Sequence, residues 1–166
     1  MELKDIIIDS ILLNDKLKNS IITFDEFRDD LSLTVKKEEL LDFSNFLFNC
    51  NELQFIICRD VTAVDWAKSK ERFTVVYNLY SFLLNKYLRL KVILDGLYPE
   101  VESVCSVWKS ADWYERETYD MYGLKFLNHP DLRRMYMPEE FEYYPLRKEF
   151  PVMGIPGSLP LPEMGD

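Results

Sequence analysis

Three carboxylates lie close together in the stretch 113–123, where the sequence comes nearest to a catalytic pattern. Glu115, Glu117 and Asp120 could serve as a general acid and a general base. However, no serine, threonine or cysteine nucleophile lies beside a base that could activate it, and no glycine-rich phosphate-binding loop is present. We therefore expect this chain to contain no catalytic residue.

The single histidine and the three cysteines show whether the sequence carries a metal site. His129 precedes a proline in an irregular segment, which is more typical of a structural hydrogen-bonding histidine than of a catalyst. Cys50, Cys58 and Cys105 form no CxxC or other ligand spacing. Cys50 and Cys58 have apolar neighbours, which favours buried thiols in a reducing compartment. We expect this chain to bind no metal ion, iron–sulfur cluster or other cofactor.

The composition excludes several classes of function. The 166 residues suffice for one domain with its own core, and the net charge of −9 argues against binding to nucleic acid or anionic lipid. No apolar run approaches the roughly 18–20 residues that span a bilayer. The first residues also lack the basic and apolar segments of a signal peptide. We expect any contact with a membrane to be indirect, through a partner.

The first 108 residues show a mixture of helix and strand patterns. Apolar spacing predicts helices over 3–14 and 36–48, the second with Leu40, Phe43 and Leu47 facing the core and Thr34 as its N-cap. Strands are predicted at 19–24, 31–35, 53–58, 73–80 and 87–94, with a turn at 25–30. The short link between the last two strands predicts an antiparallel hairpin. The expected fold is α+β, a mixed, mostly antiparallel sheet flanked by helices.

A further helix follows this body. Residues 101–108 are predicted to form a helical turn, and either Ser110 or Asp112 begins the helix. Asp112 and Glu115 resemble a capping box, and Gly123 is expected to end the helix.

Beyond this C-terminal helix, the chain has the pattern of a long extended arm. Prolines follow His129, Met137 and Tyr144, and each favours extended backbone at the residue before it. The predicted organisation is a globular body over 1–108, a helix over 109–124 and a partner-binding arm over 125–166.

The predicted helix places Glu117 in an unfavourable position. At 100° per residue, Trp113, Tyr114 and Met121 share one apolar face, with Glu117 among them. A buried carboxylate without a partner is costly, so we expect an arginine of the arm to pair with Glu117 unless the helix turns it to water. The candidate arginines are Arg133, Arg134 and Arg147. Arg116 and Asp120, four residues apart, can pair with each other.

The arm carries two basic pairs beside apolar residues. Arg133 and Arg134 lie between Leu132 and Met135. The second pair is Arg147 and Lys148, with Leu146 before it and Phe150 shortly after it. Basic pairs are commonly solvated, but arginine among apolar and aromatic residues is also the composition of protein–protein hot spots. The pattern favours an interface for both pairs.

Three motifs together resemble one family, the 30 kDa-type C subunit of the proton-pumping NADH:quinone oxidoreductase, or respiratory complex I. Their residues are Glu115, Arg116, Glu117, Asp120 and Gly123, then His129, Pro130, Asp131, Arg133 and Arg134, then Pro145, Leu146, Arg147 and Lys148. Residues 60–65, 72–77 and 101–111 are also similar, whereas residues 1–50 match only in position and predicted structure. Tyr143 stands where the family commonly has glycine, and Glu149 where it has aspartate.

The resemblance implies an α+β subunit without a redox cofactor, with FMN and iron–sulfur clusters carried by partner subunits. It implies contacts with the cluster-bearing subunits B and I, and an arm that lies along the large D subunit. The complex passes electrons from NADH to quinone and translocates protons, so this chain would support assembly as a peripheral subunit on the cytoplasmic side of the bacterial inner membrane. The alternative is the equivalent subunit of an energy-converting hydrogenase or of a dehydrogenase with another electron donor.

Overall fold

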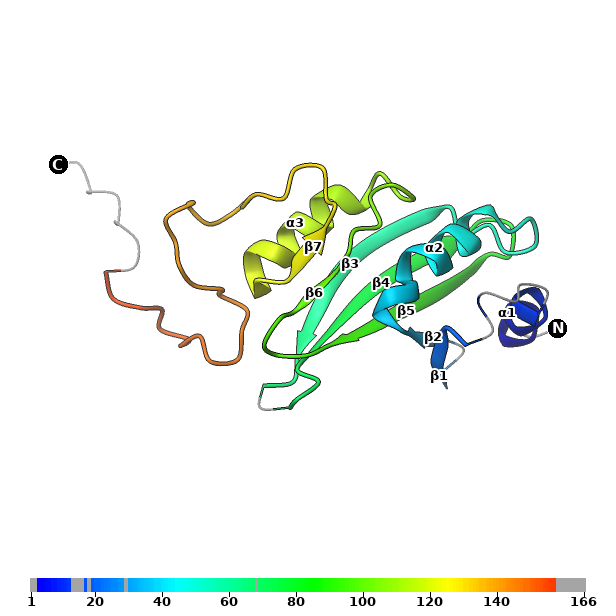
Figure 1. Ribbon diagram of the computed structural model, residues 1–166, viewed down its shortest axis with the longest axis horizontal. Coiled ribbons are helices and arrows are strands. Elements are labelled where there is room, and N and C mark those ends of the chain that lie inside the picture. Colours follow the sequence, from blue (N-terminus) through cyan, green and yellow to red (C-terminus); the bar gives the residue numbers. More distant parts are fainter. Residues whose placement is uncertain (1–2, 13–16, 18, 29, 68, 158–166) are drawn as a thin grey trace.

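The computed structural model describes residues 3–12, 17, 19–28, 30–67 and 69–157 and shows an α+β fold (Figure 1). Its elements are α1 (Leu3–Leu12), β1 (Ile21–Phe27), β2 (Asp30–Val35), the 3-10 helix η1 (Lys37–Glu39), α2 (Leu40–Asn49), β3 (Ile57–Asp65), β4 (Phe73–Ser81), β5 (Lys86–Leu94), β6 (Glu100–Glu102), α3 (Ala111–Tyr122) and β7 (Lys125–Leu127). The predicted fold class is confirmed.

Five strands form the main sheet in the order β1-β2-β5-β4-β3. All neighbouring strands are antiparallel except β2 and β5, which are parallel. The predicted hairpin is confirmed, because Ser81 pairs with Lys86 where β4 turns into β5. The sheet is therefore mixed and mostly antiparallel, as predicted.

One face of this sheet carries the core. Alternate residues of β4 and β5 are buried because successive side chains of a strand point to opposite faces; they are Phe73, Val75, Tyr77, Leu79, Leu88, Leu90, Val92 and Leu94. Leu40, Phe43 and Leu47 of α2 are fully buried in the same cluster, which confirms the predicted stripe. Burying each such side chain contributes about 1.5–3 kcal/mol, so this face holds the body together.

The strand predicted at 53–58 is wrong. Leu53 and Phe55 are fully buried, but they lie in the loop after α2, where the N–H of Phe55 bonds to the carbonyl of Leu47. Gln54 between them has a φ of 44°, which lies outside the extended region that strand residues ordinarily adopt. The apolar pattern at 53–55 came from loop residues that fill the core, and the strand begins only at Ile57.

The predicted helix starts also need correction. Thr34 lies in β2, and the first turn after it is η1, whose N-cap Lys36 makes no side-chain cap bond. Residues 100–102 form strand β6, so only the end of the predicted turn is helical, with Trp108 N–H bonded to Val104 O at 2.9 Å. Helix α3 begins at Ala111 without a side-chain cap, because Ser110 Oγ donates to Cys58 O instead.

Helix α3 is bonded to the body, and the arm begins after β7. Thr118 Oγ1 donates to Val61 O of β3 at 2.9 Å, and β6 pairs in parallel with β7. After β7 the chain contains no helix or strand through residue 157, and Figure 1 shows this arm at the end of the molecule opposite α1. The boundaries proposed at 108 and 124 remain predictions.

Candidate functional site

Helix α3 buries several polar residues more completely than its aromatic ones. Trp113 is 58% exposed, whereas Glu115 and Asp120 are fully buried. The predicted apolar face around Glu117 is therefore wrong. The carboxylates that α3 buries instead are Glu115 and Asp120, and backbone N–H groups of neighbouring segments bond to both. This outcome has a physical basis, since a buried carboxylate is tolerated where hydrogen-bond donors surround it.

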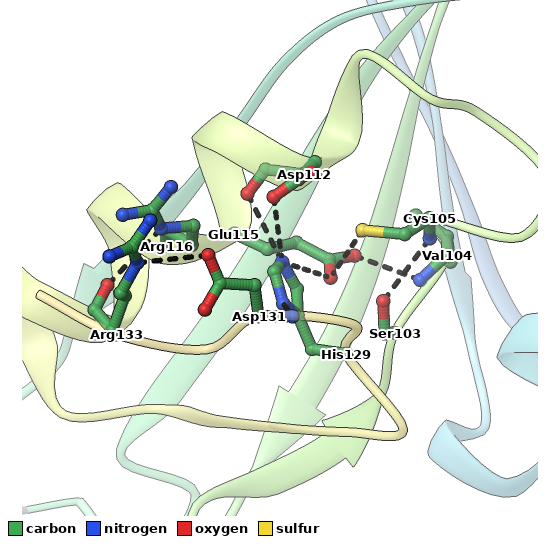
Figure 2. A network of polar contacts seen from close by, with 9 residues as sticks. All are labelled: Ser103, Val104, Cys105, Asp112, Glu115, Arg116, His129, Asp131 and Arg133. Carbon is green, nitrogen blue, oxygen red and sulfur yellow. Dashed lines mark hydrogen bonds and ion pairs between the residues drawn. The ribbon is translucent and has the colours of Figure 1, made fainter. Parts of the chain in front are cut away.

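Glu115 is bonded to the turn that precedes α3 (Figure 2). Its Oε1 accepts the N–H of Val104 at 2.8 Å, and its Oε2 accepts the thiol of Cys105 at 3.3 Å. Burial raises the pKa of Glu115 to about 7, although hydrogen bonds from Ser103, Val104 and Cys105 oppose that shift. The predicted capping box is wrong, because Glu115 turns into the core and bonds to Val104 instead.

His129 lies in the first part of the arm and contacts α3. The N–H of Asp131 donates to His129 Nδ1 at 3.0 Å, so this nitrogen carries no proton. The other nitrogen, Nε2, then donates to the carbonyl of Asp112 at 3.1 Å and lies 4.0 Å from Glu115 Oε2. His129 is thus held as the neutral Nε2–H tautomer and ties the arm to the helix.

The donor atoms of Cys105, Glu115 and His129 lie within 4.8 Å of one another, which sequence spacing did not reveal. A metal on His129 Nε2 would require a proton on Nδ1, which would then face the N–H of Asp131. It would also require a thiolate, whereas burial raises the pKa of Cys105 to about 12. The hydrogen bonds favour a structural network over a metal site.

Asp120 anchors the arm. Its Oδ1 accepts Nη1 of Arg134 at 2.7 Å, and its Oδ2 accepts the backbone N–H groups of Met135, Tyr136 and Met137 at 3.0, 2.7 and 3.0 Å. Burial raises the pKa of Asp120, but these bonds outweigh it and hold the pKa below its usual value. We call this contact the Asp120 latch.

The pairings predicted for Glu117 and Arg116 are both wrong. Glu117 is half-buried, and no hydrogen bond or ion pair joins it to another described residue. Arg116 donates through Nε to Arg133 O at 3.3 Å and stacks over the Trp113 ring at 4.8 Å, away from Asp120. The arm is anchored through Asp120, about one helical turn from the predicted residue, because four donors of the arm bond to Asp120.

A second contact holds the arm beside the end of α3. Gly123 ends the helix with a φ of 70°, as predicted, and its N–H bonds to Tyr119 O. Arg147 donates through Nε to Tyr122 O at 2.6 Å and stacks over Tyr144 at 4.5 Å. A Cβ at Gly123 would come within 2.6 Å of the Tyr144 ring, so glycine allows this close approach as well as the turn.

The comparisons with known proteins support the resemblance. The profile of the family described as "Respiratory-chain NADH dehydrogenase, 30 Kd subunit" matches residues 33–155. The chain is 44% identical to the C subunit of the NADH-quinone oxidoreductase of Geobacter sulfurreducens over 145 residues, which cover 87% of this chain and 88% of that protein. It is 45% identical to the corresponding C subunit of Bartonella bacilliformis over 142 residues, covering 86% and 67%.

The chain belongs to this family of 30 kDa subunits. A trypsin-resistant fragment of Nqo5 has the same fold, with a TM-score of 0.63 and 22% identity over 80% of this chain and all of that one. A chain of the membrane-bound sulfane sulfur reductase, described as an archaeal respiratory membrane complex, matches with a TM-score of 0.71 and 23% identity, covering 90% and 86%. Within the described residues, no helix is long and apolar enough to cross a membrane.

Several signature residues of this 30 kDa family chain serve internal contacts. Arg134 pairs with the carboxylate of Asp120, and Arg147 donates to the carbonyl of Tyr122. Both arginine side chains are therefore largely covered by this chain itself. Among the described residues, Arg133 forms an ion pair only with Asp131, at 2.9 Å, and both side chains are more than half exposed. Leu146 is 50% exposed. The remaining outward-facing signature residues are Pro130 and Lys148.

Sequence reasoning missed a second buried aspartate in this 30 kDa family chain. Asp65, at the end of β3, accepts two bonds from Arg72, one from the N–H of Ala67 and one from the N–H of Lys148. The Arg72 bond holds the pKa of Asp65 below its usual value despite burial, and Arg72 also pairs with Glu149. No spacing could have indicated this contact, because it joins residues 83 positions apart.

Proposed function

We propose that this chain is a non-catalytic, peripheral subunit of an NADH-quinone oxidoreductase that supports assembly of the complex. Its relatives of 41–45% identity are named as C subunits of that enzyme. The buried carboxylates Glu115, Asp120 and Asp65 are bonded to the chain's own N–H groups, thiol and arginines, which leaves none of them placed to act on a substrate. In this role, FMN, iron–sulfur clusters and quinone are bound by other subunits.

The observation that carries the proposal is that the arm is hydrogen-bonded to the body while several of its apolar side chains remain exposed. The Asp120 latch and the bonds to Asp65 hold two stretches of the arm against the body. Tyr136, Leu146, Val152 and Met153 nevertheless remain at least half exposed. Such pre-ordering lowers the entropy cost of binding, so the arm suits a large partner.

We assign the arm to the large D subunit and the body to the cluster-bearing subunits B and I. The complex would then transfer electrons from NADH to quinone and translocate protons, with this chain on the cytoplasmic side of the bacterial inner membrane. The net charge of −9 fits membrane contact through partners rather than directly.

The second candidate is the equivalent subunit of an energy-converting hydrogenase or another dehydrogenase. The specific observation behind it is the fold shared with a chain of the membrane-bound sulfane sulfur reductase, an archaeal complex with a different activity in its name. That likeness concerns the fold alone, at 23% identity, whereas the higher sequence identities all lead to C subunits of NADH-quinone oxidoreductase.

Affinity purification of the tagged full chain from solubilised membranes tests the proposal. We expect flavoprotein and iron–sulfur subunits to co-purify together with NADH:quinone activity. A chain truncated after Met137 keeps the Asp120 latch, so it should stay folded by circular dichroism yet lose the large subunit. Recovery of a nickel-binding large subunit would support the hydrogenase alternative, and undiminished association of the truncated chain would refute the role of the arm.

A further inference from the structure

The arm encloses a hollow of about 350 Å³ on its own surface. Its lining consists of residues 142–144, Arg147, residues 149–151 and Ile155. Val152 and Met153, which belong to the same turn, are almost completely exposed. The hollow therefore lies in the segment of the arm that offers apolar side chains to a partner.

Three aromatic rings line this hollow, and among the described residues only the Tyr144 ring has a cation over it. Tyr144 carries two of the chain's own guanidinium groups, those of Arg147 at 4.5 Å and Arg134 at 5.2 Å. Tyr143 is 40% exposed and touches other rings only by tilted or edge contacts, Phe141 at 5.5 Å and Phe150 at 6.4 Å. No cation of the described residues lies over the Tyr143 ring.

The uncompensated charge at the rim is negative. Glu149 already pairs with Arg72, and Arg147 lies 3.9 Å from the same carboxylate. Glu142 is exposed, lines the hollow beside Tyr143, and forms no ion pair with any described residue. An aromatic ring next to a free carboxylate is a combination that attracts a cation, and a guanidinium satisfies both by stacking and pairing.

We propose that this hollow receives an arginine of a partner subunit, which stacks on Tyr143 and pairs with Glu142. This inference rests on the proposed function, because it requires a partner that covers the arm. It adds a site to those expected from the sequence, in which the basic pairs of this chain would provide the hot spots. Arg134 and Arg147 are used internally, so the matching arginine comes from the other side of the interface.

The test compares two charge reversals in the complex purified from membranes through a tag on this chain. Glu142→Lys places a like charge against the incoming arginine, whereas Glu140→Lys makes the same change two residues away, outside the hollow. We expect E142K to reduce the yield of the large partner subunit by about tenfold, the equivalent of about 1.4 kcal/mol, and more strongly at low salt. E140K should reduce it less than about twofold.

Two further measurements show whether a lower yield of the partner subunit comes from a weaker contact or from an unfolded chain. Both variants should unfold at the same urea concentration as the wild-type chain, since both side chains are exposed. A photo-reactive phenylalanine analogue at position 143 should cross-link to an arginine-containing peptide of the partner. Equal losses for E142K and E140K, no loss for either, or a cross-link confined to apolar and acidic peptides would overturn the proposal. Failure of the wild-type chain itself to recover partners would instead contradict the proposed function.

Discussion

At the scale of single residues, the buried carboxylates of α3 differ in how they are satisfied. Asp120 accepts bonds from one arginine and three backbone N–H groups, whereas Glu115 accepts bonds from one N–H, one thiol and one hydroxyl. Burial acts on both, but only Asp120 has enough donors to keep its pKa below the usual value. One carboxylate thus stabilises the fold as an anion, while the other is destabilising when it is charged.

Asp120→Asn should lower the free energy of unfolding of the full chain by about 2–4 kcal/mol, because it removes a charge that Arg134 and the latch N–H groups compensate. Urea denaturation at pH 7 measures the change. Glu117→Gln is the matched control: Glu117 lies on the same helix without a described partner, so the change should stay below about 0.5 kcal/mol. A larger loss for Glu117→Gln than for Asp120→Asn would restore the anchor predicted from the sequence.

At the scale of elements, the end of α3 and the arm determine each other's conformation. Gly123 has a positive φ that favours glycine. A Cβ added there would also lie 2.6 Å from the Tyr144 ring and 2.7 Å from the Arg147 guanidinium. The helix stop was readable from the sequence, but the packing of the arm over it was not. Gly154 has a similar φ of 73° with no atom within 4 Å of an added Cβ.

These two glycines allow strain and packing to be measured separately. Gly123→Ala should destabilise the chain by more than about 2 kcal/mol, the sum of backbone strain and a displaced arm, whereas Gly154→Ala should cost about 1 kcal/mol. Limited trypsin digestion should cut after Arg147 faster in the first variant only. Equal effects at the two positions would mean that the arm does not pack over Gly123.

At the scale of the whole molecule, stability should depend on pH through Glu115. Its pKa rises from 4.5 to about 7 on folding, so between those values the unfolded chain loses a proton that the folded chain keeps. The free energy of unfolding should therefore fall as pH rises from about 5 to 8, by up to about 3 kcal/mol, and level off above that range. The lowered pKa values of Asp65 and Asp120 act in the opposite direction, with loss of stability as pH falls below their unfolded values.

Urea denaturation of Glu115→Gln across this pH range isolates the effect. The variant should show an almost flat profile between pH 5 and 8, while Glu117→Gln should keep the decline of the wild-type chain. A wild-type profile that rises with pH in this window would contradict the assignment.

The sequence by itself determined the family, the α+β class, the β4–β5 hairpin, the α2 stripe and the stop at Gly123. These features depend on motifs or on neighbours within a few residues, where periodicity and turn chemistry act directly. Only the tertiary structure decided that Asp120 and Asp65, rather than Glu117, hold the arm, and that Leu53 and Phe55 fill the core from a loop. A buried carboxylate is stable where donors from distant parts of the chain converge on it, and a helical wheel contains no information about those donors.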